Sequence, residues 1–236
     1  MEAAPRVRFE LQPQPTDTSC GPTCLQAVYN YYGDFIPVAS LIDEVPELET
    51  GGTLAVQLGL HALRRGYAAE LFTYNLRVFD PTWFDLETAE MARRLEQRIG
   101  RRHSAKRRLA MQAYLDFIRL GGQVRLEVLN EGLIRSLLES NLPILTGLSS
   151  TFLYSSPREI PTNDKEDDIR GEPVGHFVVL CGCDPLAGTV HVADPDHENP
   201  LSEDRIYPVS IDRLINAILL GVFTYDGNLL VLQPRD

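Results

Sequence analysis

The chain has 236 residues, of which 44% are hydrophobic and 23% charged, a composition typical of a globular protein that buries a full core and not of a disordered one. Its net charge of −11 argues against general affinity for nucleic acid, so we expect no nucleic-acid partner. The longest apolar runs are far shorter than the roughly 20 residues of a membrane-spanning helix. Because the N-terminus also lacks the apolar stretch of a secretory signal, we expect a cytoplasmic protein with no membrane segment.

Helical patterns dominate the first third of the chain. After Cys20 the apolar residues recur at helical spacing, Pro22 suits a first helical turn, and Gly33 stands where a helix would end. A helix is therefore predicted to begin at or just after Cys20. A shorter and a longer helix are predicted to follow, at 37–44 and 53–65.

A strand at 67–74 is followed by a segment of about 80–122 that we interpret as a helical insertion with two helices. The stretch from Arg93 to Arg108 holds eight basic residues and one acid, Glu96. A solvated helix face is the common reason for such a run, and a docking patch for an anionic partner is the alternative.

The remaining chain reads mostly as strands. We expect strands at 124–128, 142–148 and 228–233, helices at 131–140 and 210–220, and an aperiodic surface loop at 149–172. The segments "GHFVVLCGC" and "TVHVAD", separated by "DPLAG", predict a hairpin of two strands. The class is α+β: a single domain spanning 1–236, with N-terminal helices packed on an antiparallel sheet and a helical insertion.

The chain has four cysteines, which raises the question of a metal site. Structural zinc sites usually pair cysteines two to four residues apart on turns. Here Cys20 and Cys24 belong to a helix start, whereas Cys181 and Cys183 lie on one face of an apolar strand, a setting typical of cysteine as a small hydrophobic residue. We therefore expect no metal and no other cofactor.

Cys20 differs from the other three because its neighbours are polar or small, which predicts an exposed position at the helix entry. At that position the unpaired N–H groups and the positive end of the helix dipole favour a thiolate. Cys20 is therefore a candidate nucleophile, with an inert residue of the helix entry as the alternative.

The predicted hairpin supplies a candidate base. His176 begins one strand and Asp194 ends the other, so both lie at the open end of the hairpin. If the register pairs even-numbered positions, the two side chains point the same way within cross-strand reach. The Asp194 carboxylate could then orient the imidazole and stabilise its cation.

Acyl transfer also requires donors for an oxyanion. The backbone N–H of Cys20 is one candidate, and the side-chain amide of Gln14, six residues earlier, is the other. From spacing alone Gln14 is equally a polar residue of a Pro-rich leader.

Together, "QPTDTSCGPTCLQAVYNYYG" and the distant "GHFVVLCGCDPLAGTVHVADP" resemble the papain-like cysteine peptidases that process bacteriocin leader peptides, of the double-glycine type, and their stand-alone relatives. The resemblance covers roughly 14–66 and 132–207. It implies a papain-like fold with Cys20 as nucleophile, His176 as base and acid, Asp194 as orienting group and Gln14 as oxyanion donor.

These residues favour a soluble cysteine peptidase or amidase that cleaves a peptide or amide substrate through an acyl-enzyme. Two alternatives stay open. The acyl group could pass to an amine, giving isopeptide or γ-glutamyl products as in the related phytochelatin synthases, or the fold could serve as a non-catalytic binding module.

Overall fold

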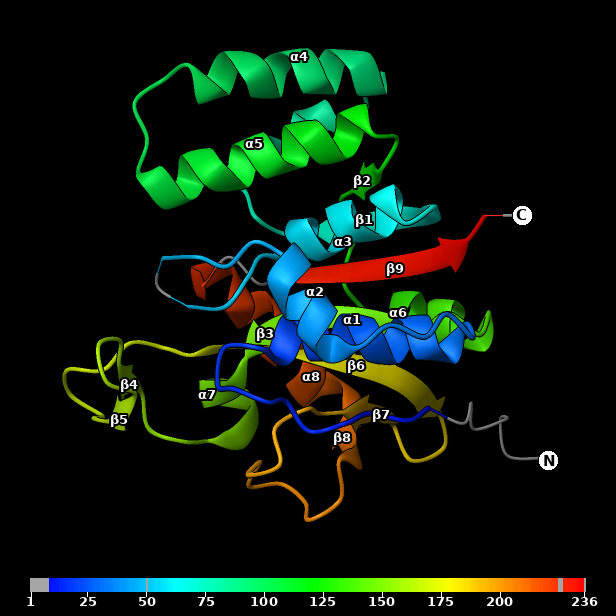
Figure 1. Ribbon diagram of the computed structural model, residues 1–236, viewed down its shortest axis with the longest axis vertical. Helices are drawn as coiled ribbons and strands as arrows, with labels where there is room; N and C mark the ends of the chain where they lie inside the picture. The colour runs from blue at the N-terminus through cyan, green and yellow to red at the C-terminus, as the bar shows by residue number, and fades with distance from the viewer. Residues whose placement is uncertain (1–8, 50, 225–226, 236) are drawn as a thin grey trace.

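The computed structural model describes residues 9–49, 51–224 and 227–235, and shows one large sheet with helices on both faces (Figure 1). The α-helices of this part of the chain are α1 (Cys20–Tyr31), α2 (Val38–Glu44), α3 (Ala55–Arg64), α4 (Thr88–Ile99), α5 (Ala105–Arg119), α6 (Glu131–Glu139), α7 (Ser150–Tyr154) and α8 (Ile211–Leu220). Two short 3-10 helices are η1 (Pro81–Trp83) and η2 (Gly221–Thr224). The strands are β1 (Tyr67–Thr73), β2 (Gln123–Arg125), β3 (Ile144–Ser149), β4 (Glu159–Ile160), β5 (Lys165–Glu166), β6 (Gly175–Asp184), β7 (Thr189–Ala193), β8 (Ile206–Ser210) and β9 (Asn228–Pro234).

The large sheet has seven strands in the order β2-β1-β9-β3-β6-β7-β8. All neighbouring strands in it are antiparallel except β1 and β2, which are parallel. Strands β4 and β5 form a separate small hairpin in the loop between α7 and β6. None of the helices within the described ranges combines the length and the apolar character needed to cross a membrane.

Strand alternation divides the core into two layers. On β6, Phe177 and Val179 pack into the layer formed with α1, α3 and α5, whereas Val178 and Leu180 pack into the layer formed with α6 and α8. All four side chains are at most 3% exposed. The centre of the sheet is thus apolar on both faces, which explains the continuous apolar run of β6.

Helix α1 packs directly against β6 and begins at the residue that the sequence pattern predicts. Pro22 lies within its first turn, where a missing N–H breaks no helical hydrogen bond. The helix ends before Gly33, whose φ of +78° is a left-handed conformation that glycine adopts without strain. The first turn of α1 is therefore fixed at one end of β6.

The segment interpreted as an insertion forms the hairpin of α4 and α5 (Figure 1). Helix α5 is built into the main core, because Met111 and Phe117 are fully buried in the layer shared with α1 and α3. Gly59 of α3 allows this close contact: a Cβ there would lie 2.7 Å from a ring carbon of Phe117.

We expect Gly59→Ala to destabilise the protein by about 1 kcal/mol or more, because overpacking of a buried contact typically costs about 1–3 kcal/mol and outweighs the better helix propensity of alanine. Chemical denaturation measures this change in the free energy of unfolding. Gly100→Ala is the matched control, since a Cβ there meets only the Gln97 carbonyl oxygen at 3.5 Å. Equal stability of both variants would contradict the close packing of α5 on α3.

The predicted α+β class is confirmed, and most predicted elements are present. Two expectations need correction: the strand predicted at 124–128 is the shorter β2, and the segment 149–172, expected to be an aperiodic loop, contains α7, β4 and β5. Strand β8 was not predicted. The sequence of this segment has no long periodic run, so its short elements leave little pattern to read.

Candidate active site

Cys20 is the first residue of α1, and the structure buries it. Its exposed fraction is 7%, so the exposed position expected from its polar neighbours is wrong. The cause is tertiary: a Cβ on the adjacent Gly21 would meet Thr53 at 2.7 Å and Phe177 at 3.3 Å, which shows how closely distant segments surround this turn. Cys20 is therefore largely enclosed by other parts of the fold.

The hairpin of β6 and β7 brings His176 and Asp194 together. Their register pairs Leu180 with Val192 and Val179 with Ala193, so residues of equal parity are opposite one another near the open end. The His176 Nε2 lies 2.8 Å from Asp194 Oδ1, and the two residues are 7% and 0% exposed. The ring nitrogen and the carboxylate thus form a buried, charge-assisted hydrogen bond.

Cys20 completes this arrangement from the opposite side of the imidazole. Cys20 lies close enough to His176 to affect its ionisation, because a side-chain hydrogen bond with Cys20 and the charge of Cys20 both raise the pKa of His176. Because Nε2 already donates to Asp194, the other ring nitrogen, Nδ1, is the one available to the sulfur. Three residues separated by up to 174 positions in the chain therefore form one continuous set of contacts.

The Asp194 carboxylate is held by more donors than His176 alone. Its Oδ1 also accepts a hydrogen bond from the backbone N–H of Asp196 at 3.0 Å. Its Oδ2 accepts hydrogen bonds from the hydroxyls of Tyr154 at 2.6 Å and Tyr207 at 2.5 Å. We call these two residues the tyrosine clamp.

The tyrosine clamp was not predicted from the sequence. Tyr207 belongs to β8 and Tyr154 ends α7, two elements that the sequence pattern did not reveal. The weak signal available was the alternation of β8, whose buried residues, Tyr207 and Val209, alternate with exposed ones.

These contacts shift the ionisation of the site. Burial alone would raise the pKa of Asp194, but the charge of His176 and hydrogen bonds from His176, Tyr154 and Tyr207 lower it below its ordinary value. Burial alone would lower the pKa of His176, but the Asp194 carboxylate and hydrogen bonds with Asp194 and Cys20 raise it well above its ordinary value. The arrangement thus favours a carboxylate beside an imidazolium.

Gln14 lies beside the residue that follows Asp194. Its backbone N–H donates to the carbonyl of Pro195 at 2.9 Å, which fixes the N-terminal segment at this corner. The side-chain oxygen of Gln14 is buried and has no hydrogen-bond partner in the described part of the chain. The amide is therefore held next to the site by its backbone and not by a side-chain bond.

The other cysteines lie in separate surroundings. The Cys24 sulfur donates to the carbonyl of Phe177 at 3.3 Å and is fully buried. Cys181 packs into the layer of α1, whereas Cys183 packs against the layer of α6 and α8, so the expectation that they share one face is wrong. A register shift between Leu180 and Gly182 reverses the alternation at this point of β6.

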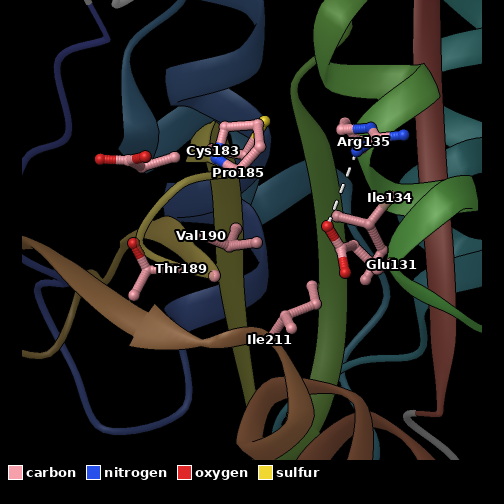
Figure 2. Close-up of a pocket in the computed structure, with 10 residues that line it drawn as sticks. Glu131, Ile134, Arg135, Cys183, Pro185, Thr189, Val190 and Ile211 are labelled. Carbon is pink, nitrogen blue, oxygen red and sulfur yellow. Dashed lines mark ion pairs between the residues drawn. The ribbon is translucent and has the colours of Figure 1, made fainter.

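A surface hollow lies at the other end of the same hairpin. Figure 2 shows it between α6 and the turn of β6 and β7, with Arg135 and Glu131 paired at 3.7 Å and Cys183 on its wall. Cys183 lies seven positions after His176 in β6, which at the rise of a strand places the hollow roughly 20 Å from the imidazole. This hollow is therefore separate from the candidate active site.

No family model and no curated protein matches this chain. Solved structures do. A putative C39-like peptidase from Bacillus anthracis aligns over 100% of both chains, with a TM-score of 0.53 and 13% identity. The peptidase domain of Streptococcus ComA, a bifunctional ABC transporter, aligns over 97% of this chain and 100% of its own, with a TM-score of 0.46 and 15% identity.

A double glycine motif protease from an AMS/PCAT transporter, in complex with its leader peptide, aligns over 98% of this chain and 94% of its own, with a TM-score of 0.45 and 12% identity. The fold assignment rests on the Bacillus anthracis protein, whose TM-score exceeds 0.5 over the full length of both chains. In agreement with the resemblance seen in the sequence, this protein has the papain-like fold of the C39-like peptidases.

Proposed function

We propose that the protein is a cysteine peptidase or amidase in which Cys20 is the nucleophile, His176 the general base and acid, and Asp194 the group that orients the imidazole. The observation that carries the proposal is the continuous set of buried contacts from Cys20 through His176 to Asp194. Acyl transfer requires this arrangement, in which the nucleophile contacts a base and the base contacts an orienting group.

In the first half-reaction His176 accepts the thiol proton of Cys20, and the thiolate attacks the carbonyl carbon of the substrate. The oxyanion accepts hydrogen bonds from the backbone N–H of Cys20, which as a first-turn donor has no partner within the helix, and from the side-chain amide of Gln14. His176 then gives its proton to the leaving amine, and a thioester remains on Cys20.

In the second half-reaction a water molecule attacks the thioester. His176 takes a proton from this water, and the same proton then returns to the Cys20 sulfur as the carboxylic acid leaves. Transfer to an amine would differ only in the attacking group. We propose hydrolysis over transfer to an amine because this protein shares its fold with a C39-like peptidase.

The raised pKa of His176 supports this role, since the site favours the imidazolium that forms when the base accepts a proton. The Asp194 carboxylate, which is 0% exposed and keeps its charge through four hydrogen bonds, stabilises that cation. The site is thus arranged to hold the positive charge that His176 gains when it accepts the thiol proton.

A peptidyl electrophile such as a vinyl sulfone tests the proposal. We expect it to modify Cys20 at neutral pH, because the reagent places its reactive carbon where the substrate carbonyl would lie. Peptide mapping by mass spectrometry identifies the modified residue. The variant Cys20→Ser should give no adduct, whereas Cys183→Ser, which removes a more exposed cysteine, should label like the parent protein.

Two results would contradict the assignment. One is modification of Cys24, Cys181 or Cys183 while Cys20 stays free. The other is equal labelling of Cys20 in the parent protein and in a His176→Ala variant, since the imidazole would then do nothing for the reactivity of the sulfur.

A further inference from the structure

The hairpin of α4 and α5 ends in a strongly basic tip, which we define as residues 98–108. It comprises the end of α4, the connection 100–104 and the first turn of α5. The tip holds six basic residues and no Asp or Glu, in a chain whose net charge is −11. The basic residues of the tip are Arg98, Arg101, Arg102, Lys106, Arg107 and Arg108.

The acids of the two helices do not neutralise this tip. Glu90 pairs with Arg93 and Arg94, one or more turns away, and Glu96 pairs with Arg119 at the far end of α5. Asp80 lies within electrostatic reach of Arg98, but its carboxylate accepts hydrogen bonds from Thr82.

In the described part of the chain, no ion pair engages the side chains of Arg101, Arg102, Arg107 or Arg108. The tip therefore keeps an uncompensated positive charge, and this charge belongs to the connection and the first turn of α5.

Three nitrogens at the tip lack hydrogen-bond partners. The Nε atoms of Arg98 and Arg107 and the Nδ1 of His103 are buried, yet none has a partner in the described part of the chain. The great majority of buried N–H groups in proteins are satisfied, so two unsatisfied guanidinium donors, one from the end of α4 and one from the first turn of α5, indicate a missing acceptor. An anion is the acceptor that suits positively charged donors.

The local backbone holds these groups in place. The Nε2 of His103 donates to the carbonyl of Arg98 at 2.9 Å, which folds the connection over the end of α4. A terminal nitrogen of Arg98 donates to the carbonyl of Arg77 at 3.0 Å, so this guanidinium is anchored while its Nε stays unpaired. The Ser104 hydroxyl accepts from the backbone N–H of Arg107, which starts α5 there.

The N-terminus of α5 adds the positive end of a helix dipole to the positive charge of the tip. This helix has 15 residues, and its first turn contains no acidic side chain that would offset the positive end of the dipole. The positive end of this helix dipole and the guanidinium groups of the tip thus favour the same kind of ligand.

We propose that the tip of the α4–α5 hairpin is a binding site for a phosphate group, either inorganic phosphate or the terminal phosphate of a small phosphomonoester. A phosphate dianion presents several acceptor oxygens in a tetrahedral arrangement, so it can accept from separate donors such as Arg98 and Arg107, whereas a carboxylate offers two oxygens in one plane. The site needs no part of the proposed peptidase reaction.

Titration calorimetry with inorganic phosphate tests this proposal, with chloride added to keep a low ionic strength constant. We expect one saturable site per chain. Arg107→Gln and Arg107→Lys should each weaken binding about tenfold, because both remove the Nε–H and a hydrogen bond between charged groups is worth about that factor. Arg119→Gln removes the same charge from the far end of α5 and should bind like the parent protein.

The lysine variant separates a built site from general attraction, since it keeps the charge of Arg107. Binding of phosphate by Arg107→Lys at the parent affinity would overturn the proposal, as would the absence of saturable binding or an equal loss in Arg119→Gln. If Arg107→Gln fails to fold, as judged by its thermal transition, Arg98→Gln gives the same test.

A second titration with glycerol 2-phosphate identifies the source of the phosphate. Tighter binding of the ester than of inorganic phosphate indicates a phosphomonoester ligand, and equal binding indicates that the phosphate group alone is recognised. Sedimentation with phosphatidylserine vesicles tests the alternative. Binding to vesicles without binding of either small ligand would contradict the proposal and show a surface for anionic membranes instead.

Discussion

Replacing His176 with alanine is expected to lower kcat/KM for a cleaved peptide by about 10³-fold or more, because the imidazole acts in both half-reactions and general acid–base catalysis contributes about 10²–10⁴-fold per step. His176 is buried, is bonded to Asp194 and interacts with Cys20, so its loss removes the group that links the nucleophile to the carboxylate. Peptides found to be cleaved by mass spectrometry supply the substrate for this measurement.

The exposed His197 provides the matched control. It follows Asp194 by three residues, and its side chain is 66% exposed. His197→Ala should therefore keep the activity of the parent protein. Activity of His176→Ala within a few-fold of the parent protein would remove His176 from the mechanism.

A double variant distinguishes catalysis from structural damage. If Cys20 and His176 act as one unit, the variant with both residues changed to alanine should be no less active than Cys20→Ala alone. Losses that multiply would instead indicate two independent effects. Thermal transitions of the three variants report separately on folding.

The sequence predicted the parts of the site that depend on local pattern. The start of α1 at Cys20 follows from helical spacing, Pro22 and Gly33, and these signals lie within one short segment. The placement of His176 and Asp194 at the open end follows from hairpin pairing around a short turn, although the pairing of residues of equal parity there depends on the register shift between Leu180 and Gly182. In both cases neighbouring residues carry the information.

The burial of Cys20 could not be predicted in this way. Its polar neighbours indicate exposure, and the residues that enclose its helical turn, Thr53 and Phe177, are distant in the sequence. The register shift at Cys181 is similar, since a single extra residue in β6 leaves no mark on an apolar run. Tertiary packing decided both outcomes.

The tyrosine clamp shows why the surroundings of Asp194 needed the structure. Tyr154 and Tyr207 come from elements on different sides of the 195–205 connection, and only the fold brings their hydroxyls to one carboxylate oxygen. A buried carboxylate without such donors would favour protonation. The clamp therefore explains how Asp194 stays ionised while it is 0% exposed.

We expect Tyr207→Phe to lower the free energy of unfolding by about 1.5–3 kcal/mol at neutral pH, the usual worth of a hydrogen bond to a charged group. Phenylalanine fills almost the same volume, so the change removes the hydroxyl and little else. Tyr154→Phe should act in the same direction by a smaller amount, because Tyr154 is partly exposed whereas Tyr207 is 4% exposed.

Tyr74→Phe is the control for the loss of a hydroxyl. The hydroxyl of Tyr74 is buried and has no hydrogen-bond partner in the described part of the chain. Its removal should leave the stability of the protein unchanged or slightly higher. A loss equal to that of Tyr207→Phe would mean that the clamp has no special role.

The dependence of stability on pH gives a second, independent test of the tyrosine clamp. Because the folded pKa of Asp194 lies below its unfolded value, its contribution to stability is complete above the unfolded pKa and disappears as the pH falls through the folded pKa. Tyr207→Phe removes one of the bonds that depress the folded pKa, so this pKa moves upward. Both proteins should therefore begin to lose this contribution near the unfolded pKa, but the variant has less of it to lose and completes the loss at a higher pH than the parent protein.

Urea unfolding between pH 7 and pH 3 measures this shift for the parent protein, Tyr207→Phe and Tyr74→Phe. A purely structural effect of the tyrosine would lower the stability of Tyr207→Phe by the same amount at every pH. Parallel curves for the parent protein and Tyr207→Phe would thus contradict the clamp, whereas curves that converge as Asp194 becomes protonated would show that the hydroxyl acts on the charge of this carboxylate.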